Sequence, residues 1–199
     1  MRQIISLEGG PAVGKTTLAK RLQKRLPDIY FSFEDPKPAI AKALNLDKRI
    51  EQDFIANQKI FIKESIKRYQ NLPSGVVIMD LSPEETEFHT FCWPKLIGQN
   101  WDMEKSLAKE LTELRKYRST TILYLDGNDE LLRSRKASDK TRSRSSFEEY
   151  LTGLHQPRKD WFSRLDYVTI KNVANLSEEK LEGWTIGWLK DSFFMITGK

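Results

Sequence analysis

The residues with the clearest potential for chemistry lie near the N-terminus, where residues 9–16 read GGPAVGKT. This segment fits the pattern G-x-x-x-x-G-K-[ST], a glycine-rich loop whose backbone N–H groups point inward at phosphates. Lys15 can reach the β- and γ-phosphates, and the Thr16 hydroxyl can bind Mg²⁺. The spacing therefore predicts a nucleoside triphosphate site, whose expected contact residues are Gly9, Gly10, Pro11, Ala12, Val13, Gly14, Lys15, Thr16 and Thr17.

The flanking segments supply the strand and the helix that such a loop requires. Ile4, Ile5 and Leu7 predict a buried strand over residues 2–8, and residues 16–26 continue as a helix. The helix N-terminus adds partial positive charge where the phosphates would bind. With both flanking elements present, we interpret the segment as a P-loop rather than as a chance glycine turn.

Carboxylates follow two further predicted strands. Asp80 comes after the four apolar residues of VVIM, a pattern that can place a carboxylate beside Mg²⁺ but also occurs by chance. Glu34 and Asp35 follow a predicted strand over residues 29–33 and precede Pro36, so they also fit a turn-forming acidic cluster.

Gln58 lies on the apolar stripe of a long helix predicted over residues 47–71, four positions from both Phe54 and Ile62. An amide on an apolar face needs a hydrogen-bond partner. That partner is either the backbone within the core or a bound ligand.

A basic segment follows the predicted strand 121–125. It contains one acidic residue, Asp139, and six basic ones: Arg133, Arg135, Lys136, Lys140, Arg142 and Arg144. Such cations can close as a lid, at about 133–145, over a transferring phosphoryl group. A solvated loop and a surface that binds nucleic acid are the alternatives.

The expected organisation is a single domain over residues 1–199, with five short strands alternating with helices. This alternation predicts a parallel sheet covered on both faces. The last strand is expected at 166–170 and an irregular aromatic stretch at 91–101, followed by a helix capped by Asp102. Asn128 and Ser177 are expected caps, and Ser145 with Glu148 forms a capping box.

Composition limits the class of protein. The chain has 199 residues, one cysteine and a net charge of +5, and it lacks an apolar run of membrane-spanning length. The early strand leaves no room for a targeting peptide, so we expect a cytoplasmic location and no membrane partner. We attribute the positive charge to a polyphosphate site rather than to nucleic-acid binding.

The P-loop alone does not separate switches, motors and kinases. The N-K-x-D motif of GTPases is missing from the sequence, and the chain is short for a transporter ATPase. The P-loop followed by a basic segment favours a phosphotransferase.

With these features in place, most of the chain resembles the deoxynucleoside kinase and thymidylate kinase group of P-loop kinases. Asp35-Pro36 is similar to the Glu-Pro of that group, and Asp80-Leu81-Ser82 to its acidic-Arg-Ser motif. Gln58 matches the glutamine that pairs with the base of the acceptor. The basic segment and the following EEYLTGLHQPRKDWF are similar to the lid and the helix after it.

The resemblance implies a three-layer α/β/α P-loop NTPase fold with strand order 2-3-1-4-5. It implies transfer of the γ-phosphate of ATP, with Mg²⁺, to a nucleoside 5′-hydroxyl or a nucleoside monophosphate. Glu34 or Asp35 would be the base, Gln58 with Glu34 and Asp80 would bind the acceptor, and Thr16 and Asp80 would lie at the metal. The lid would contribute Arg133, Arg135, Arg142 and Arg144, and the helix 47–71 could pair with a second copy in a homodimer.

The sequence departs from the group at Leu81, where the group has an arginine. Another cation, such as Lys37 or a lid arginine, would have to replace it. A kinase of another small alcohol, such as an antibiotic or a sugar, and a P-loop protein that handles nucleic acid stay open as alternatives. His89 and His155 are assigned no catalytic role.

Overall fold

The computed structural model describes residues 2–33, 44–139 and 147–197. Its strands form one parallel sheet in the order β2-β3-β1-β4-β5, which confirms the predicted fold class and strand order. The strands are β1 (Arg2–Gly9), β2 (Tyr30–Ser32), β3 (Gly75–Asp80), β4 (Thr121–Asp126) and β5 (Val168–Asn172).

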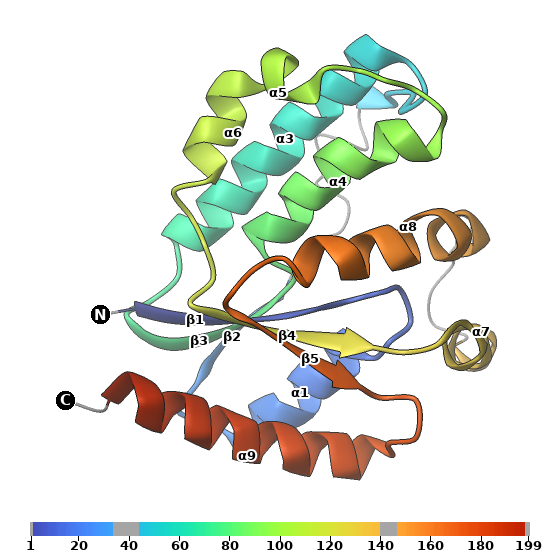
Figure 1. The fold of residues 1–199 in the computed structure, drawn as a ribbon. Helices are drawn as coiled ribbons and strands as arrows, with labels where there is room; N and C mark the ends of the chain where they lie inside the picture. The colour runs from blue at the N-terminus through green and yellow to red at the C-terminus, as the bar shows by residue number, and fades with distance from the viewer. Residues whose placement is uncertain (1, 34–43, 140–146, 198–199) are drawn as a thin grey trace.

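Helices cover both faces of the sheet (Figure 1). They are α1 (Lys15–Arg25), α3 (Glu51–Gln70), α4 (Pro83–Leu96), α5 (Met103–Ser106), α6 (Ala108–Leu114), α7 (Asp129–Ser138), α8 (Phe147–Phe162) and α9 (Glu178–Thr197). In Figure 1, α3, α4, α6 and α8 lie above the sheet and α1 and α9 lie below it, so the predicted three layers are present.

Strand β4 shows how the sheet supplies both halves of the core. Leu123 and Leu125 pack in a cluster with residues of α1, whereas Tyr124 packs on the other face with Phe88 and Phe162. Successive side chains of a strand point to opposite faces, so an apolar strand buries residues on both.

Helix α4 corrects one expectation. It continues through the aromatic residues to Leu96, although residues 91–96 were expected to be irregular. Trp93 is buried, stacks on His89 and donates its indole N–H to Lys48 O at 3.1 Å. Pro94 lies in the last turn, where the loss of one backbone hydrogen bond costs little against this burial.

The segment after Asp102 also differs from its expectation. Asp102 caps as predicted, since its carboxylate accepts from the Lys105 N–H at 3.0 Å. The helix then breaks at Leu107, whose backbone leaves helical geometry between α5 and α6. Four apolar side chains of this segment are nevertheless buried, and they are Met103, Leu107, Leu111 and Leu114.

Two other predicted caps can be located. Asn128 accepts from the Leu131 N–H at 2.9 Å and Ser177 from the Lys180 N–H at 3.2 Å. Ser145 of the predicted capping box lies outside the described residues. In the described part of the chain, no helix combines the length and the apolar character that crossing a membrane requires.

Candidate active site

The loop between β1 and α1 has the strongly curved backbone that a phosphate site needs. Gly9, Ala12 and Gly14 all have positive φ, at 135°, 62° and 105°. A Cβ on Gly9 would lie 2.4 Å from the Leu125 carbonyl oxygen of neighbouring β4, so only glycine fits there. Ala12 adopts a conformation that alanine rarely takes, a strain typical of functional sites.

Lys15 begins α1 and bends back over this loop. Its ammonium donates to Gly9 O at 2.7 Å and to Gly10 O at 3.0 Å. Burial lowers the pKa of Lys15, and the nearby Asp80 carboxylate opposes that shift. The ammonium can exchange these two carbonyl oxygens for phosphate oxygens, which are stronger acceptors because they are charged.

Thr16 and Asp80 meet at the carboxyl ends of β1 and β3. The Thr16 hydroxyl donates to Oδ2 of Asp80 at 2.6 Å. Oδ1 of Asp80 is buried and has no partner among the described residues. A carboxylate oxygen and a hydroxyl suit Mg²⁺, which usually takes one or two carboxylates and completes its shell with phosphates and water. The residues present therefore fit this ion.

The turn after Asp80 is held from two sides. Leu81 has a φ of 65°, and its carbonyl accepts from Arg68 of α3, which also donates to Asp80 O at 3.0 Å. On the other side, Oε1 of Glu8 accepts from the Ser82 N–H at 2.7 Å. This network fixes the position of the Asp80 carboxylate.

Sequence reasoning missed both Arg68 and Glu8. Glu8 is fully buried at the end of β1, and burial, followed by the nearby Glu85 carboxylate, raises its pKa well above the usual range. The available signal was an acidic residue directly after an apolar strand and directly before the glycines of the loop. No comparable signal marked Arg68, because its partners are backbone carbonyls of a turn distant in sequence.

The two described lid arginines differ in their contacts. Arg135 of α7 donates to Val13 O of the phosphate loop, so its guanidinium lies against the predicted site. Arg133 instead pairs with Glu148 at 3.1 Å and Asp129 at 3.7 Å. Four predicted site residues lie outside the described part of the chain, and they are Glu34, Asp35, Arg142 and Arg144.

Gln58 is buried on α3 and faces α4. The Thr90 hydroxyl lies 3.0 Å from Oε1 of Gln58 and 2.8 Å from Thr86 O, so one proton is shared between two acceptors. Among the described residues, the Thr90 hydroxyl is the one side-chain partner of Gln58. This partner is a side chain rather than the backbone, and it contacts the amide oxygen, so the N–H groups of the amide can donate to another group.

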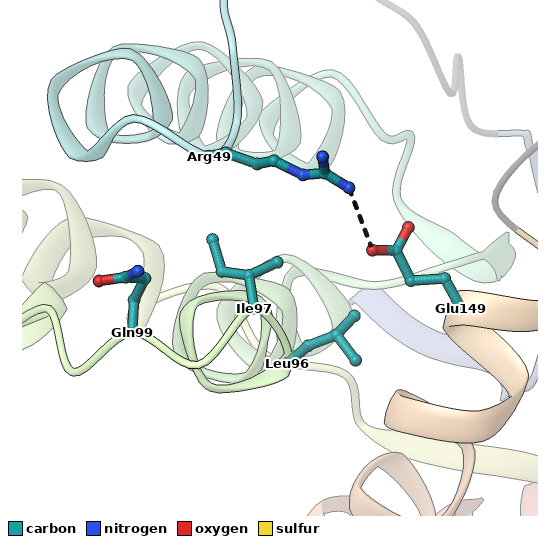
Figure 2. A pocket seen from close by; sticks show the side chains of 5 residues that line it. All are labelled: Arg49, Leu96, Ile97, Gln99 and Glu149. Carbon is teal, nitrogen blue, oxygen red and sulfur yellow. Dashed lines mark ion pairs between the residues drawn. The ribbon is translucent and has the colours of Figure 1, made fainter.

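A separate pocket of about 380 Å³ opens beside the end of α4 and the start of α8. Figure 2 shows its lining and the ion pair between Arg49 and Glu149, whose charged atoms are 3.9 Å apart. The remaining lining residues are Leu96, Ile97 and Gln99. None of the predicted site residues lines this pocket, so the candidate active site is a different place.

No protein-family model and no curated protein sequence matches the chain. Solved structures do match it. Deoxyadenosine kinase from M. mycoides with dCMP and dCDP bound has 16% identity and a TM-score of 0.74, covering 95% of this chain and 100% of that one. The same enzyme with bound dCTP has 15% identity and a TM-score of 0.69, covering 95% and 100%.

Thymidylate kinase from Candida albicans is also similar, with 16% identity, a TM-score of 0.69 and coverage of 96% of this chain and 92% of that one. At sequence identities this low, the structural similarity establishes only the fold. The likeness to deoxynucleoside and thymidylate kinases that the motifs indicated is therefore confirmed at the level of the fold.

Proposed function

We propose that the chain is a nucleoside or nucleotide kinase that transfers the γ-phosphate of ATP to a nucleoside 5′-hydroxyl or to a nucleoside monophosphate. The observation that carries this proposal is the placement of Lys15 and the Thr16–Asp80 pair at one P-loop, within a fold like that of deoxyadenosine and thymidylate kinases. The motifs at Gln58 and Asp80 support the choice of acceptor.

The chain's own groups account for binding of the donor. The N–H groups of the loop and the N-terminus of α1 would bind the phosphates, and Lys15 would neutralise the β- and γ-phosphate oxygens. Arg135, which already contacts the loop through Val13 O, would add charge from the lid. Thr16 and Asp80 would hold Mg²⁺, which would supply positive charge to offset the charge that develops on the phosphate oxygens.

On the acceptor side, Gln58 would offer both a donor and an acceptor to a base edge, because the Thr90 hydroxyl, its one described side-chain partner, contacts only the amide oxygen. Glu34 or Asp35 would accept the proton of the attacking hydroxyl. Residues 133–145 would form the lid of a single catalytic domain, and α3 would be the surface for pairing with a second copy.

Label transfer from γ-³²P-ATP to a panel of nucleosides and nucleoside monophosphates tests the proposal. We expect one acceptor to become labelled in a Mg²⁺-dependent reaction. Label in water alone would indicate a hydrolase, and label in sugars or aminoglycosides alone would favour a kinase of other alcohols. Salt-sensitive binding to DNA or RNA without transfer would favour nucleic-acid handling.

A further inference from the structure

Several buried polar atoms without a partner gather around the candidate site. Each of the following is buried and lacks a hydrogen bond within the described residues: Glu8 Oε2, Asp80 Oδ1, Ser82 Oγ, Tyr124 OH and Arg158 Nη1. Glu8 and Tyr124 are paired in register on neighbouring strands, and Ser82 is bonded to Glu8. Folded proteins rarely leave such atoms unpaired, so their concentration in one region indicates a polar ligand.

Arg158 of α8 is the cation of this group, and one edge of its guanidinium is fixed. Nη2 donates to Oε1 of Glu85 at 2.7 Å, and Nε donates to Oε2 of Glu85 at 3.1 Å. The guanidinium also lies over the Phe88 ring, 4.9 Å from its centre, and the residue is 4% exposed. These contacts hold the side chain rigidly, and among the residues that the structure describes none accepts the two N–H groups of Nη1.

The free edge belongs to the same region as the phosphate loop. The charge of Arg158 lies close enough to Lys15 to contribute to lowering the pKa of that ammonium, after the larger effect of burial. Glu85, its partner, is five residues after Asp80, in the first turn of α4. One short segment therefore positions both the carboxylate expected at the metal and the arginine.

We propose that Arg158 is a second cation of the phosphoryl-transfer site, where Nη1 donates to the phosphoryl group in transit. Arg158 would thereby replace the arginine that the similar kinases have at the position of Leu81. The inference rests on the proposed function. In that step the bond from the γ-phosphorus to the bridging oxygen breaks, and its electron pair stays on ADP. The acceptor oxygen forms the new bond and loses its proton to the base, while Arg158 transfers no proton.

This assignment differs from a purely structural ion pair in one respect. A structural pair between α4 and α8 would need only the Nε and Nη2 contacts with Glu85, and it would gain nothing from a buried, unpaired Nη1. A rigid donor aimed at developing charge is instead the arrangement that stabilises a transition state, because no reorganisation is needed when the reaction occurs.

The test compares ATP with ADP binding in Mg²⁺ by calorimetry, which needs no acceptor. The variant Arg158→Leu with Glu85→Leu removes both charges, so neither is left buried alone. The matched control is Arg115→Leu with Glu87→Leu, an ion pair at 2.7 Å between the residue that ends α6 and the same helix α4. We expect the preference for ATP over ADP to fall at least about tenfold in the first variant and to persist in the control.

Turnover with the best acceptor should fall about 100-fold or more in the Arg158 variant, as when a preorganised donor is removed. A folded variant that keeps the wild-type ATP preference and turnover would overturn the inference. If the double variant does not fold, Arg158→Lys retains an ion pair with Glu85 but removes Nη1, and the same loss of ATP preference is expected. A wild-type protein that labels no acceptor refutes the proposed function, yet its ATP preference still tests Arg158.

Discussion

The Thr16 hydroxyl donates a 2.6 Å hydrogen bond to Oδ2 of Asp80 across 64 positions of sequence. This bond ties the first turn of α1 to the end of β3 and leaves Oδ1 of Asp80 buried without a partner in the described residues. The relationship explains why a P-loop and a carboxylate after a distant strand can act as one site.

Asp80→Asn should raise the Mg²⁺ concentration needed for half-maximal turnover by about tenfold or more, because the amide oxygen is a weaker, uncharged ligand. The amide can still accept from Thr16, so the unfolding temperature without nucleotide should change little. Titration of turnover with Mg²⁺ measures the effect. An unchanged Mg²⁺ requirement would show that Asp80 lies outside the metal site.

Gly9→Ala should destabilise the fold by about 3 kcal/mol and abolish nucleotide binding. The cause is local, since Gly9 has a φ of 135° and its Cβ would lie 2.4 Å from the backbone oxygen of Leu125. Gly187→Ala, in α9 where a Cβ meets nothing within 4 Å, is the matched control. It should be neutral or stabilise by up to about 1 kcal/mol in urea denaturation. Equal effects of the two substitutions would contradict this explanation.

Structural predictions from the sequence were most accurate where the local residue pattern and the chemistry of the residues agree. The apolar runs located the five strands, and the glycine spacing located the loop that Lys15 folds over. Residues 91–96 were expected to be irregular but are helical. The contacts that stabilise this part of the helix, such as the bond from Trp93 to Lys48 O, form only in the folded chain and leave no pattern in the sequence. Arg68 and Arg158 escaped notice for the same reason: their partners are fixed by how α3, α4 and α8 pack, and packing leaves no short spacing to recognise.

Gln58→Leu should raise the KM for the acceptor by about tenfold while the KM for ATP stays the same, because one hydrogen bond to the ligand is lost. The variant keeps most of the side-chain volume on α3. Thr90→Val removes the described partner of Gln58 without removing the amide, and it should change the acceptor KM less. Parallel changes in both KM values after Gln58→Leu would indicate a role in folding instead of acceptor recognition.

His89 should make the protein sensitive to acid. Burial, helped by Lys48 and Arg158, lowers its pKa from 6.5 to about 3. The folded state therefore holds the ring neutral, whereas the unfolded chain binds a proton below about pH 6.5. This histidine therefore leaves the free energy of unfolding unchanged above about pH 6.5. As the pH drops from 6.5 toward 3 it lowers that free energy, by at most about 1.4 kcal/mol per pH unit.

His89→Phe removes the titrating group and preserves a ring that can stack on Trp93, the partner of His89 at 5.6 Å. Urea denaturation at pH 7 and pH 5 measures the difference. The wild type should lose more free energy of unfolding on acidification than the variant does. Equal losses would show that His89 is protonated in the folded state as readily as in the unfolded chain.

The most direct test of the central claim is transfer of label from γ-³²P-ATP to the best nucleoside or monophosphate acceptor by the wild type and by Lys15→Ala. The account predicts strong transfer by the wild type and a loss of about 1000-fold or more in the variant, with the circular dichroism spectrum unchanged. Transfer by Lys15→Ala at the wild-type rate would contradict the assignment of the P-loop as the donor site.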